Sequence, residues 1–107
     1  PVQRFDVVNF TEVAEHLKKE HEQQMLENVL GLVDNFLIIS WSDQWDEYRG
    51  TERQEHFNPR SKRYVRRRLS RLGLSWCKDL TRELNLQLED AEVYEHWQNS
   101  VLVFRKK

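Results

Sequence analysis

The pattern of apolar and polar positions predicts a strand near each end of the chain and a third strand between them. Residues 2–8 (VQRFDVV) form a short apolar run rich in β-branched side chains, which is typical of a strand. Residues 36–41 (FLIISW) form a second such run, and residues 100–104 (SVLVF) form a third. We expect the three segments to pair in one small sheet. A hairpin that turns at Asp34-Asn35 is an alternative for the middle segment.

Apolar residues at helical spacing predict about four helices between these strands. Asn9 can cap a helix, and Glu12 follows it at the spacing of a capping box, so a first helix is expected to begin here and to end near Leu30. A polar stretch at 18–24 interrupts its apolar face, so either the helix bends or its two halves contact different partners. Further helices are expected at 59–72, at about 75–84 and at about 90–98.

Local signals mark the ends of the helix at 59–72. Asn58 and Pro59 suit the start of a helix, and Gly73 suits the left-handed residue that follows its end. The polar residues 49–58 before it carry no period and are expected to form a loop. In the next helix, the residues expected to face the core are Cys77, Leu80 and Leu84.

The composition supports one folded domain. The chain has 107 residues, which is the usual length of one domain, and its aromatic content of 11% argues against disorder. No apolar run reaches the ~18–20 residues of a membrane span, and the single cysteine, Cys77, cannot form an internal disulfide. We therefore expect a mostly helical α+β domain over residues 1–107. We expect it in the cytoplasm, or in the nucleus of a eukaryotic cell, with no membrane partner.

The charge of the chain is unevenly distributed. Seventeen Lys and Arg and eighteen Asp and Glu give a net charge of −1. Residues 58–71 hold seven of the basic residues and no acid, so the rest of the chain carries ten basic and eighteen acidic residues, a net charge of −8. A local positive field of this kind attracts an anionic partner.

The basic segment is also amphipathic when it is placed on a helical wheel. Val65, Leu69 and Leu72 line one face, and Arg60, Arg63, Arg67 and Arg71 line the opposite face, with Arg66 and Arg68 on its flanks. Guanidinium groups bind phosphate bidentately, and Arg outnumbers Lys six to one here. We therefore expect a non-catalytic protein that binds the phosphate backbone of DNA or RNA through this helix.

Two alternatives remain open for the same helix. It could bind an acidic protein surface, which would make the chain an interaction module such as a small inhibitor or adaptor. Its arginines could instead be neutralised within the chain. The acids available for that in the following helices are Glu83, Glu89, Asp90, Glu92 and Glu95.

Trp41, Trp45 and Tyr48 recur at helical spacing and would share one face if residues 42–49 were helical. Large aromatic residues of a small domain usually fill its core, but Trp and Tyr are also enriched in protein-binding surfaces. They could therefore form the contact surface of an interaction module, and stacking of nucleic-acid bases on these rings is a further option.

The chain carries little that suggests catalysis. Asp43, Asp46 and Glu47 could hold a divalent cation as part of a metal-dependent hydrolase, with His56 as a base. Acids near a helix start are more often simply solvated. The sequence contains no HExxH, no paired CxxC and no GxSxG motif. We expect no metal, no cofactor and no enzymatic activity.

Overall fold

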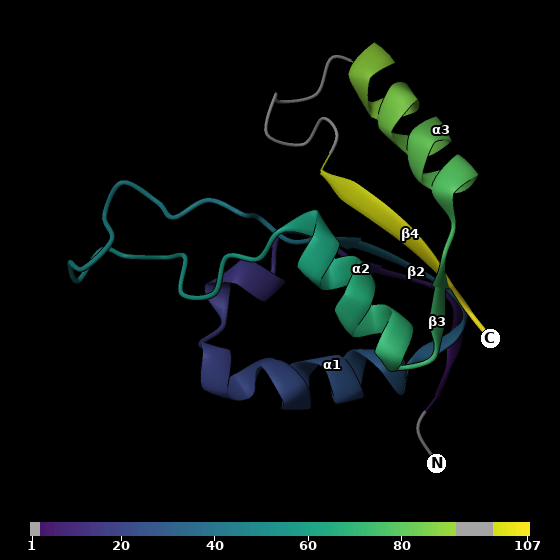
Figure 1. The fold of residues 1–107 in the computed structure, drawn as a ribbon, viewed down its shortest axis with the longest axis horizontal. Coiled ribbons are helices and arrows are strands. Elements are labelled where there is room, and N and C mark those ends of the chain that lie inside the picture. Colours follow the sequence, from purple (N-terminus) through teal and green to yellow (C-terminus); the bar gives the residue numbers. More distant parts are fainter. Residues whose placement is uncertain (1–2, 92–99) are drawn as a thin grey trace.

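The computed structural model describes residues 3–91 and 100–107, and it shows a four-stranded mixed sheet with helices on both faces (Figure 1). The strands are β1 (Phe5–Phe10), β2 (Val33–Ser40), β3 (Leu74–Trp76) and β4 (Val101–Lys106). Their order in the sheet is β1-β2-β4-β3. β1 and β2 are parallel, whereas β4 is antiparallel to both of its neighbours. The two ends of the chain thus meet the middle strand in one sheet, as expected.

Three α-helices lie within the described residues: α1 (Glu22–Leu30), α2 (Lys62–Arg71) and α3 (Lys78–Asp90). α1 connects the parallel strands β1 and β2, and two short 3-10 turns precede it at Ala14–His16 and Lys19–His21. None of the described helices is long and apolar enough to cross a membrane. The expectation of about four helices in a mostly helical domain was too high. The helix expected at 90–98 lies outside the described residues beyond its first two positions.

The core lies between the sheet and the pair α1 and α2. Alternation along β2 and β4 turns Leu37 and Phe104 toward this side, where both are fully buried. The helices α1 and α2 contribute Met25, Leu26, Val29, Val65 and Leu69 to this core. Residues of opposite parity, such as Ile38 and Val103, face the side on which α3 lies.

The predicted first helix is wrong in its first half. Asn9 does not cap a helix, because it lies in β1 opposite Ile38 of β2 and the strand continues to Phe10. Lys18 is extended, with φ −69° and ψ 150°, which separates the first 3-10 turn from α1. The predicted end at Leu30 is confirmed. The hairpin alternative is wrong, because residues 34 and 35 lie inside β2.

α3 lies against the edge of β4 that β3 is too short to cover. Thr81 Oγ1 accepts the backbone N–H of Val103 at 2.9 Å, and Asn85 Nδ2 donates to the backbone oxygen of Val101 at 3.0 Å. Polar side chains of a helix thus take the place of a neighbouring strand and satisfy backbone groups of β4.

These polar contacts also set which face of α3 is buried. The expectation that Cys77, Leu80 and Leu84 face the core was wrong, because Thr81 and Asn85 occupy that face. Leu80 is 48% exposed, and Cys77 precedes the helix as its N-terminal cap residue. The apolar spacing of the segment was real, but Leu80 and Leu84 line a groove between α3 and the sheet and are not part of the buried core.

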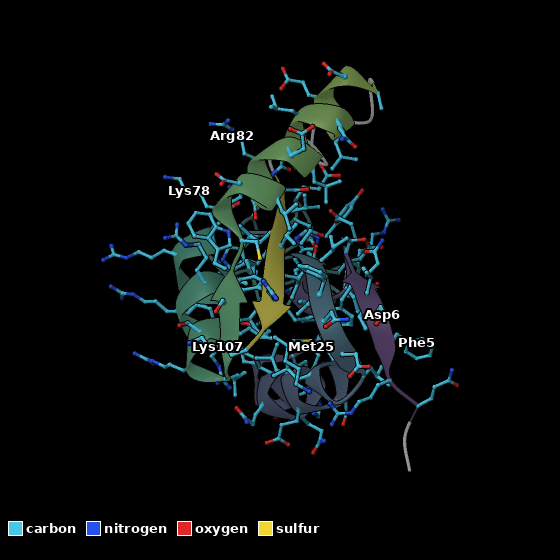
Figure 2. The ribbon with its side chains drawn as sticks, turned by 90° about the vertical axis from the view of Figure 1, so that its right-hand side faces the viewer. Phe5, Asp6, Met25, Lys78, Arg82 and Lys107 are labelled. Carbon is cyan, nitrogen blue, oxygen red and sulfur yellow. The ribbon has the colours of Figure 1, made fainter. Side chains whose placement is uncertain are left out.

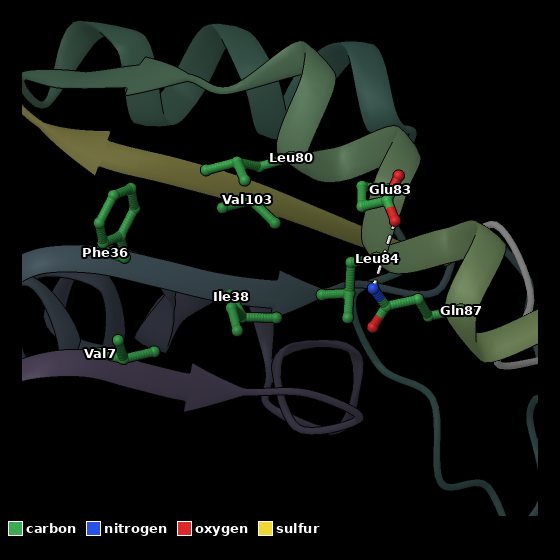
Figure 3. A pocket seen from close by; sticks show the side chains of 8 residues that line it. All are labelled: Val7, Phe36, Ile38, Leu80, Glu83, Leu84, Gln87 and Val103. Carbon is green, nitrogen blue, oxygen red and sulfur yellow. Dashed lines mark hydrogen bonds between the residues drawn. The ribbon is translucent and has the colours of Figure 1, made fainter. Parts of the chain in front are cut away.

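An apolar groove of about 400 Å³ separates α3 from the outer part of the sheet (Figure 3). Its apolar lining comes from β1, β2, β4 and α3, namely Val7, Phe36, Ile38, Val103, Leu80 and Leu84. Glu83 and Gln87 at its rim are joined by a hydrogen bond of 3.3 Å. α3 therefore covers its face of the sheet less completely than α1 and α2 cover the other.

Residues 41–61 contain no helix or strand and form a long loop that projects from the body of the protein (Figure 1). The loop expected at 49–58 is thus confirmed as part of a longer one. Its end is attached to the segment after β1, because the backbone N–H groups of Phe57 and Asn58 both donate to the backbone oxygen of Glu15.

Candidate functional site

The basic helix α2 is held in place by its apolar face and by a capping serine. Val65 and Leu69 are buried against the core, as the wheel predicts. Ser61, rather than Asn58-Pro59, begins the helix, because its Oγ accepts the backbone N–H of Tyr64 at 3.1 Å. Gly73 follows the helix with φ 96°, the left-handed conformation that was predicted for it.

Glu22 of α1 is buried and binds two of the arginines that were expected to face outward. Arg60 Nε lies 3.1 Å from Glu22 Oε1, and Arg68 Nε lies 3.2 Å from Glu22 Oε2. Asn58 Nδ2 donates to Oε1 at 2.8 Å, and the Tyr64 hydroxyl donates to Oε2. Four side chains thus converge on one carboxylate.

This cluster shifts the pKa values of two of its members. Burial alone would raise the pKa of Glu22, but hydrogen bonds from Tyr64, Asn58 and Arg68 and the charge of Arg60 lower it below its ordinary value. Burial and the hydrogen bond to Glu22 raise the pKa of Tyr64. Glu22 is therefore ionised at neutral pH and neutralises part of the basic segment from within.

The internal partner of the arginines was not among the acids weighed from the sequence. Within the described residues, no ion pair joins α2 to Glu83, Glu89 or Asp90, and Glu92 and Glu95 lie outside those residues. A local signal for Glu22 did exist. It shares the spacing of the buried residues of α1, which are Met25, Leu26 and Val29.

Four other arginines, hereafter the outer arginines, extend from α2 into solvent; they are Arg63, Arg66, Arg67 and Arg71. No carboxylate of the described residues lies within 4.0 Å of their side-chain nitrogens. Long side chains ending in nitrogen are seen to reach outward from α2 in Figure 2. The structure thus divides the predicted basic face, because Arg60 precedes the helix and Arg68 turns toward α1.

An aromatic ring lies beside the outer arginines. The Arg66 guanidinium lies 3.9 Å from the ring centroid of Trp76, the last residue of β3. Together with Arg67, Ser70 and Arg71, these two residues line a shallow pocket of about 660 Å³. The pocket combines positive charge with an aromatic ring, and no spacing within the sequence connects Trp76 with the arginines.

Basic residues at the start of α3 extend this surface. Lys78 and Arg82 point toward the same side of the molecule as the side chains of α2 in Figure 2. Lys78 follows Trp76 by two residues, and β3 connects α2 to α3. Both residues lie outside the segment 58–71 that the charge pattern singled out.

The aromatic residues at 41–48 do not share one face, and residues 42–49 are not helical. Trp41 is 6% exposed, and its Nε1 donates to the backbone oxygen of Asn58 at 2.7 Å. Trp45 and Tyr48 are 37% and 38% exposed on the projecting loop. The core interpretation therefore holds for Trp41, whereas Trp45 and Tyr48 are exposed enough to contact a partner.

Asp46 explains why this segment is not a helix. Its carboxylate accepts the backbone N–H groups of Tyr48 at 2.9 Å and of Glu55 and His56 at 2.6 Å each. Burial would raise the pKa of Asp46, but these hydrogen bonds lower it below its ordinary value. An aspartate that forms hydrogen bonds with nearby backbone groups favours a turn over a helix. The Asp46 carboxylate therefore stabilises the loop by joining its two sides.

The side chains that are best placed to bind a metal ion are not the acids that the sequence predicted. Within the described part of the chain, one group of three ligand-type side chains converges, formed by Glu15, His16 and His56. The predicted set of Asp43, Asp46 and Glu47 does not converge in this way. No spacing within the sequence connects His16 with His56.

Comparison of the chain with protein-family models, with curated proteins and with solved structures finds no significant match. The fold and its surface define a small α+β domain that carries a cationic helix face. Its function is therefore argued from its own residues.

Proposed function

We propose that this protein binds the phosphate backbone of DNA or RNA through the outer arginines of α2. The observation that carries the proposal is that these four exposed guanidinium groups share one helix face without a carboxylate partner among the described residues. Arginines four residues apart repel one another on an isolated helix, and a row of phosphates would offset that repulsion.

The spacing of the arginines suits an extended polyanion. Arg63, Arg67 and Arg71 are separated by four residues each, so the row extends about 12 Å along the helix axis. Contacts of this type position a protein on nucleic acid without reading its sequence. The Arg66 guanidinium, which stacks on Trp76 at one side of the row, offers a flat cationic surface on which an unpaired base could stack.

The proposal is tested by fluorescence anisotropy with labelled duplex DNA and single-stranded RNA across a salt series. If phosphates are bound, the logarithm of the association constant falls with the logarithm of salt concentration by about 0.9 per phosphate on duplex DNA. Replacing Arg63, Arg67 and Arg71 together by Gln should weaken binding and reduce this slope by about two to three.

A variant with the same change of net charge provides the control. Arg4, Lys18 and Lys19 are exposed and lie outside α2, so their joint replacement by Gln should leave most of the affinity intact. Absence of binding to both nucleic acids at low salt would refute the proposal. Equal losses in the two triple variants would show that net charge, rather than the helix face, is responsible.

A second candidate function is binding of an acidic protein surface, and the projecting loop supports it. The Arg49 guanidinium lies 3.7 Å from the ring centroid of Trp45, and that of Arg53 lies 5.7 Å from the ring of Tyr48. Tryptophan, tyrosine and arginine are the residues most enriched in binding hot spots. A labelled polyglutamate peptide tests this candidate. Replacing Trp45 and Tyr48 by Ala should then weaken peptide binding and leave nucleic-acid binding unchanged.

A further inference from the structure

A buried carboxylate without a partner lies where the projecting loop meets the segment after β1. Glu15 is fully buried, and neither carboxylate oxygen has a hydrogen-bond partner among the described residues. An unpartnered buried carboxylate is costly, and a bound cation is one arrangement that offsets this cost.

Two histidines lie beside this carboxylate. The rings of His16 and His56 are nearly perpendicular, with centroids 4.9 Å apart. One ligand atom from each of Glu15, His16 and His56 can be chosen so that all three lie within 4.8 Å of one another. Ligands bound tetrahedrally at the ~2.0–2.1 Å typical of zinc are about 3.4 Å apart, so small side-chain rotations would close the site.

Backbone carbonyl groups already orient both rings. His16 Nδ1 lies 2.9 Å from the backbone oxygen of Glu55, and His56 Nδ1 lies 2.7 Å from that of Gln44. A carbonyl oxygen can only accept, so each Nδ1 carries the proton and each Nε2 of a neutral ring carries a lone pair. Histidine ligands of metal ions are commonly held by this second hydrogen bond.

We propose that Glu15, His16 and His56 bind a divalent transition-metal ion, for which Zn²⁺ is the best-fitting candidate. Two imidazoles and one carboxylate form a donor set that suits Zn²⁺, whereas Mg²⁺ and Ca²⁺ prefer oxygen ligands alone. His16 is exposed, so the ion can reach the site from solvent and retain a fourth position for water. The bound ion would fasten the projecting loop to the turn after β1. This proposal revises the expectation of no metal and does not depend on nucleic-acid binding.

The site is tested with the full chain by isothermal titration calorimetry and thermal melting in Zn²⁺. We expect one equivalent to bind and the melting temperature to rise with Zn²⁺ concentration, because a ligand of the folded state stabilises it. Mg²⁺ should not produce this shift. His16→Ala and His56→Ala should each weaken binding at least tenfold, whereas His21→Ala, at an exposed histidine outside the cluster, should not. Cys77→Ser should also retain binding, which separates the site from the single thiol.

The variant Glu15→Gln gives two readouts of opposite sign. Removing the buried charge while keeping its shape should hold or raise the melting temperature of the metal-free protein. The same change should weaken Zn²⁺ binding at least tenfold. Unchanged Zn²⁺ affinity in His16→Ala would overturn the proposal, because this exposed residue can be replaced without disturbing the core. An affinity reduced as much by His21→Ala as by His16→Ala would overturn it as well.

Discussion

The carboxylate of Glu22 and the guanidinium of Arg68, 46 residues apart in the chain, form an ion pair of 3.2 Å between α1 and α2. This contact divides a run of three arginines by their environment. Arg68 is turned toward the body of the protein, whereas Arg66 and Arg67, the two residues before it, remain exposed. Neighbouring residues of identical type therefore have different roles.

The first prediction compares two adjacent arginines. Arg68→Gln removes a charged hydrogen-bond donor of the buried Glu22 and should lower the free energy of unfolding by about 1–2 kcal/mol. Arg67→Gln should change it by less than about 0.5 kcal/mol, because the side chain is exposed. Thermal melting measures both, at about 4–8 °C per kcal/mol for a domain of this size. Equal destabilisation by both variants would contradict this division of the helix.

The second prediction concerns acid. The folded protein lowers the pKa of Glu22, so its contribution to stability is complete above the pKa of about 4.3 expected in the unfolded chain. That contribution should be lost as the pH falls from about 5 through the folded-state pKa. Glu22→Gln should destabilise the protein at pH 7 by about 2–4 kcal/mol and lose this part of the pH dependence.

Denaturant titrations between pH 7 and pH 3 measure this effect. Asp46 also has a lowered pKa, so the difference between wild type and Glu22→Gln isolates the buried group. Glu27→Gln, at an exposed position of the same helix, should keep the wild-type profile. Stability curves of wild type and Glu22→Gln that stay parallel down to pH 3 would disprove the prediction.

The third prediction separates two tryptophans of one motif. Trp41→Ala removes a buried ring and its hydrogen bond to the Asn58 backbone, and should cost about 3–5 kcal/mol of unfolding free energy. Trp45→Ala removes a ring that contacts Arg49 on the loop surface and should cost less than about 1 kcal/mol. Melting curves with far-UV circular dichroism distinguish them. A loss at Trp45 as large as that at Trp41 would contradict the exposed placement.

The fourth prediction tests the attachment of α3 to β4. Asn85→Ala leaves the backbone oxygen of Val101 without a side-chain donor and should cost about 1–3 kcal/mol. Leu86→Ala, at the next and exposed position, should cost less than about 1 kcal/mol. The expected order, with the polar residue more important than the leucine, is the reverse of what hydrophobicity alone predicts. Chemical denaturation of the two variants decides between these orders.

Local periodicity accounts for what could be predicted. The β-branched runs marked strands, and the spacing of Val65 and Leu69 placed the apolar side of the basic helix correctly. Gly73 marked its end, because few other residues adopt the required positive φ. Such signals depend on residues a few positions apart, so a single sequence carries them. β3 gave no signal of this kind, because a strand of three residues is too short to show alternation.

The errors share a different cause. Asn9 suits a helix cap, but pairing with β2 extended the strand through it. Leu80 suits a core position, but Thr81 and Asn85 are the residues that are buried. Their side chains form hydrogen bonds with backbone groups at the edge of β4 that β3 does not cover. In each case a backbone group elsewhere in the fold required a hydrogen bond, and that requirement outweighed the local preference.

The sequence by itself determined an α+β chain with strands near its two ends and middle, and a basic amphipathic helix with an apolar side of known position. Only the tertiary structure decided which arginines face solvent, because Glu22 approaches α2 from another helix. Only the tertiary structure places His56 beside Glu15 and His16, because the loop that carries His56 returns to the segment after β1. Contacts between residues far apart in the chain leave no periodic pattern, so they emerge only when packing sets the elements against one another.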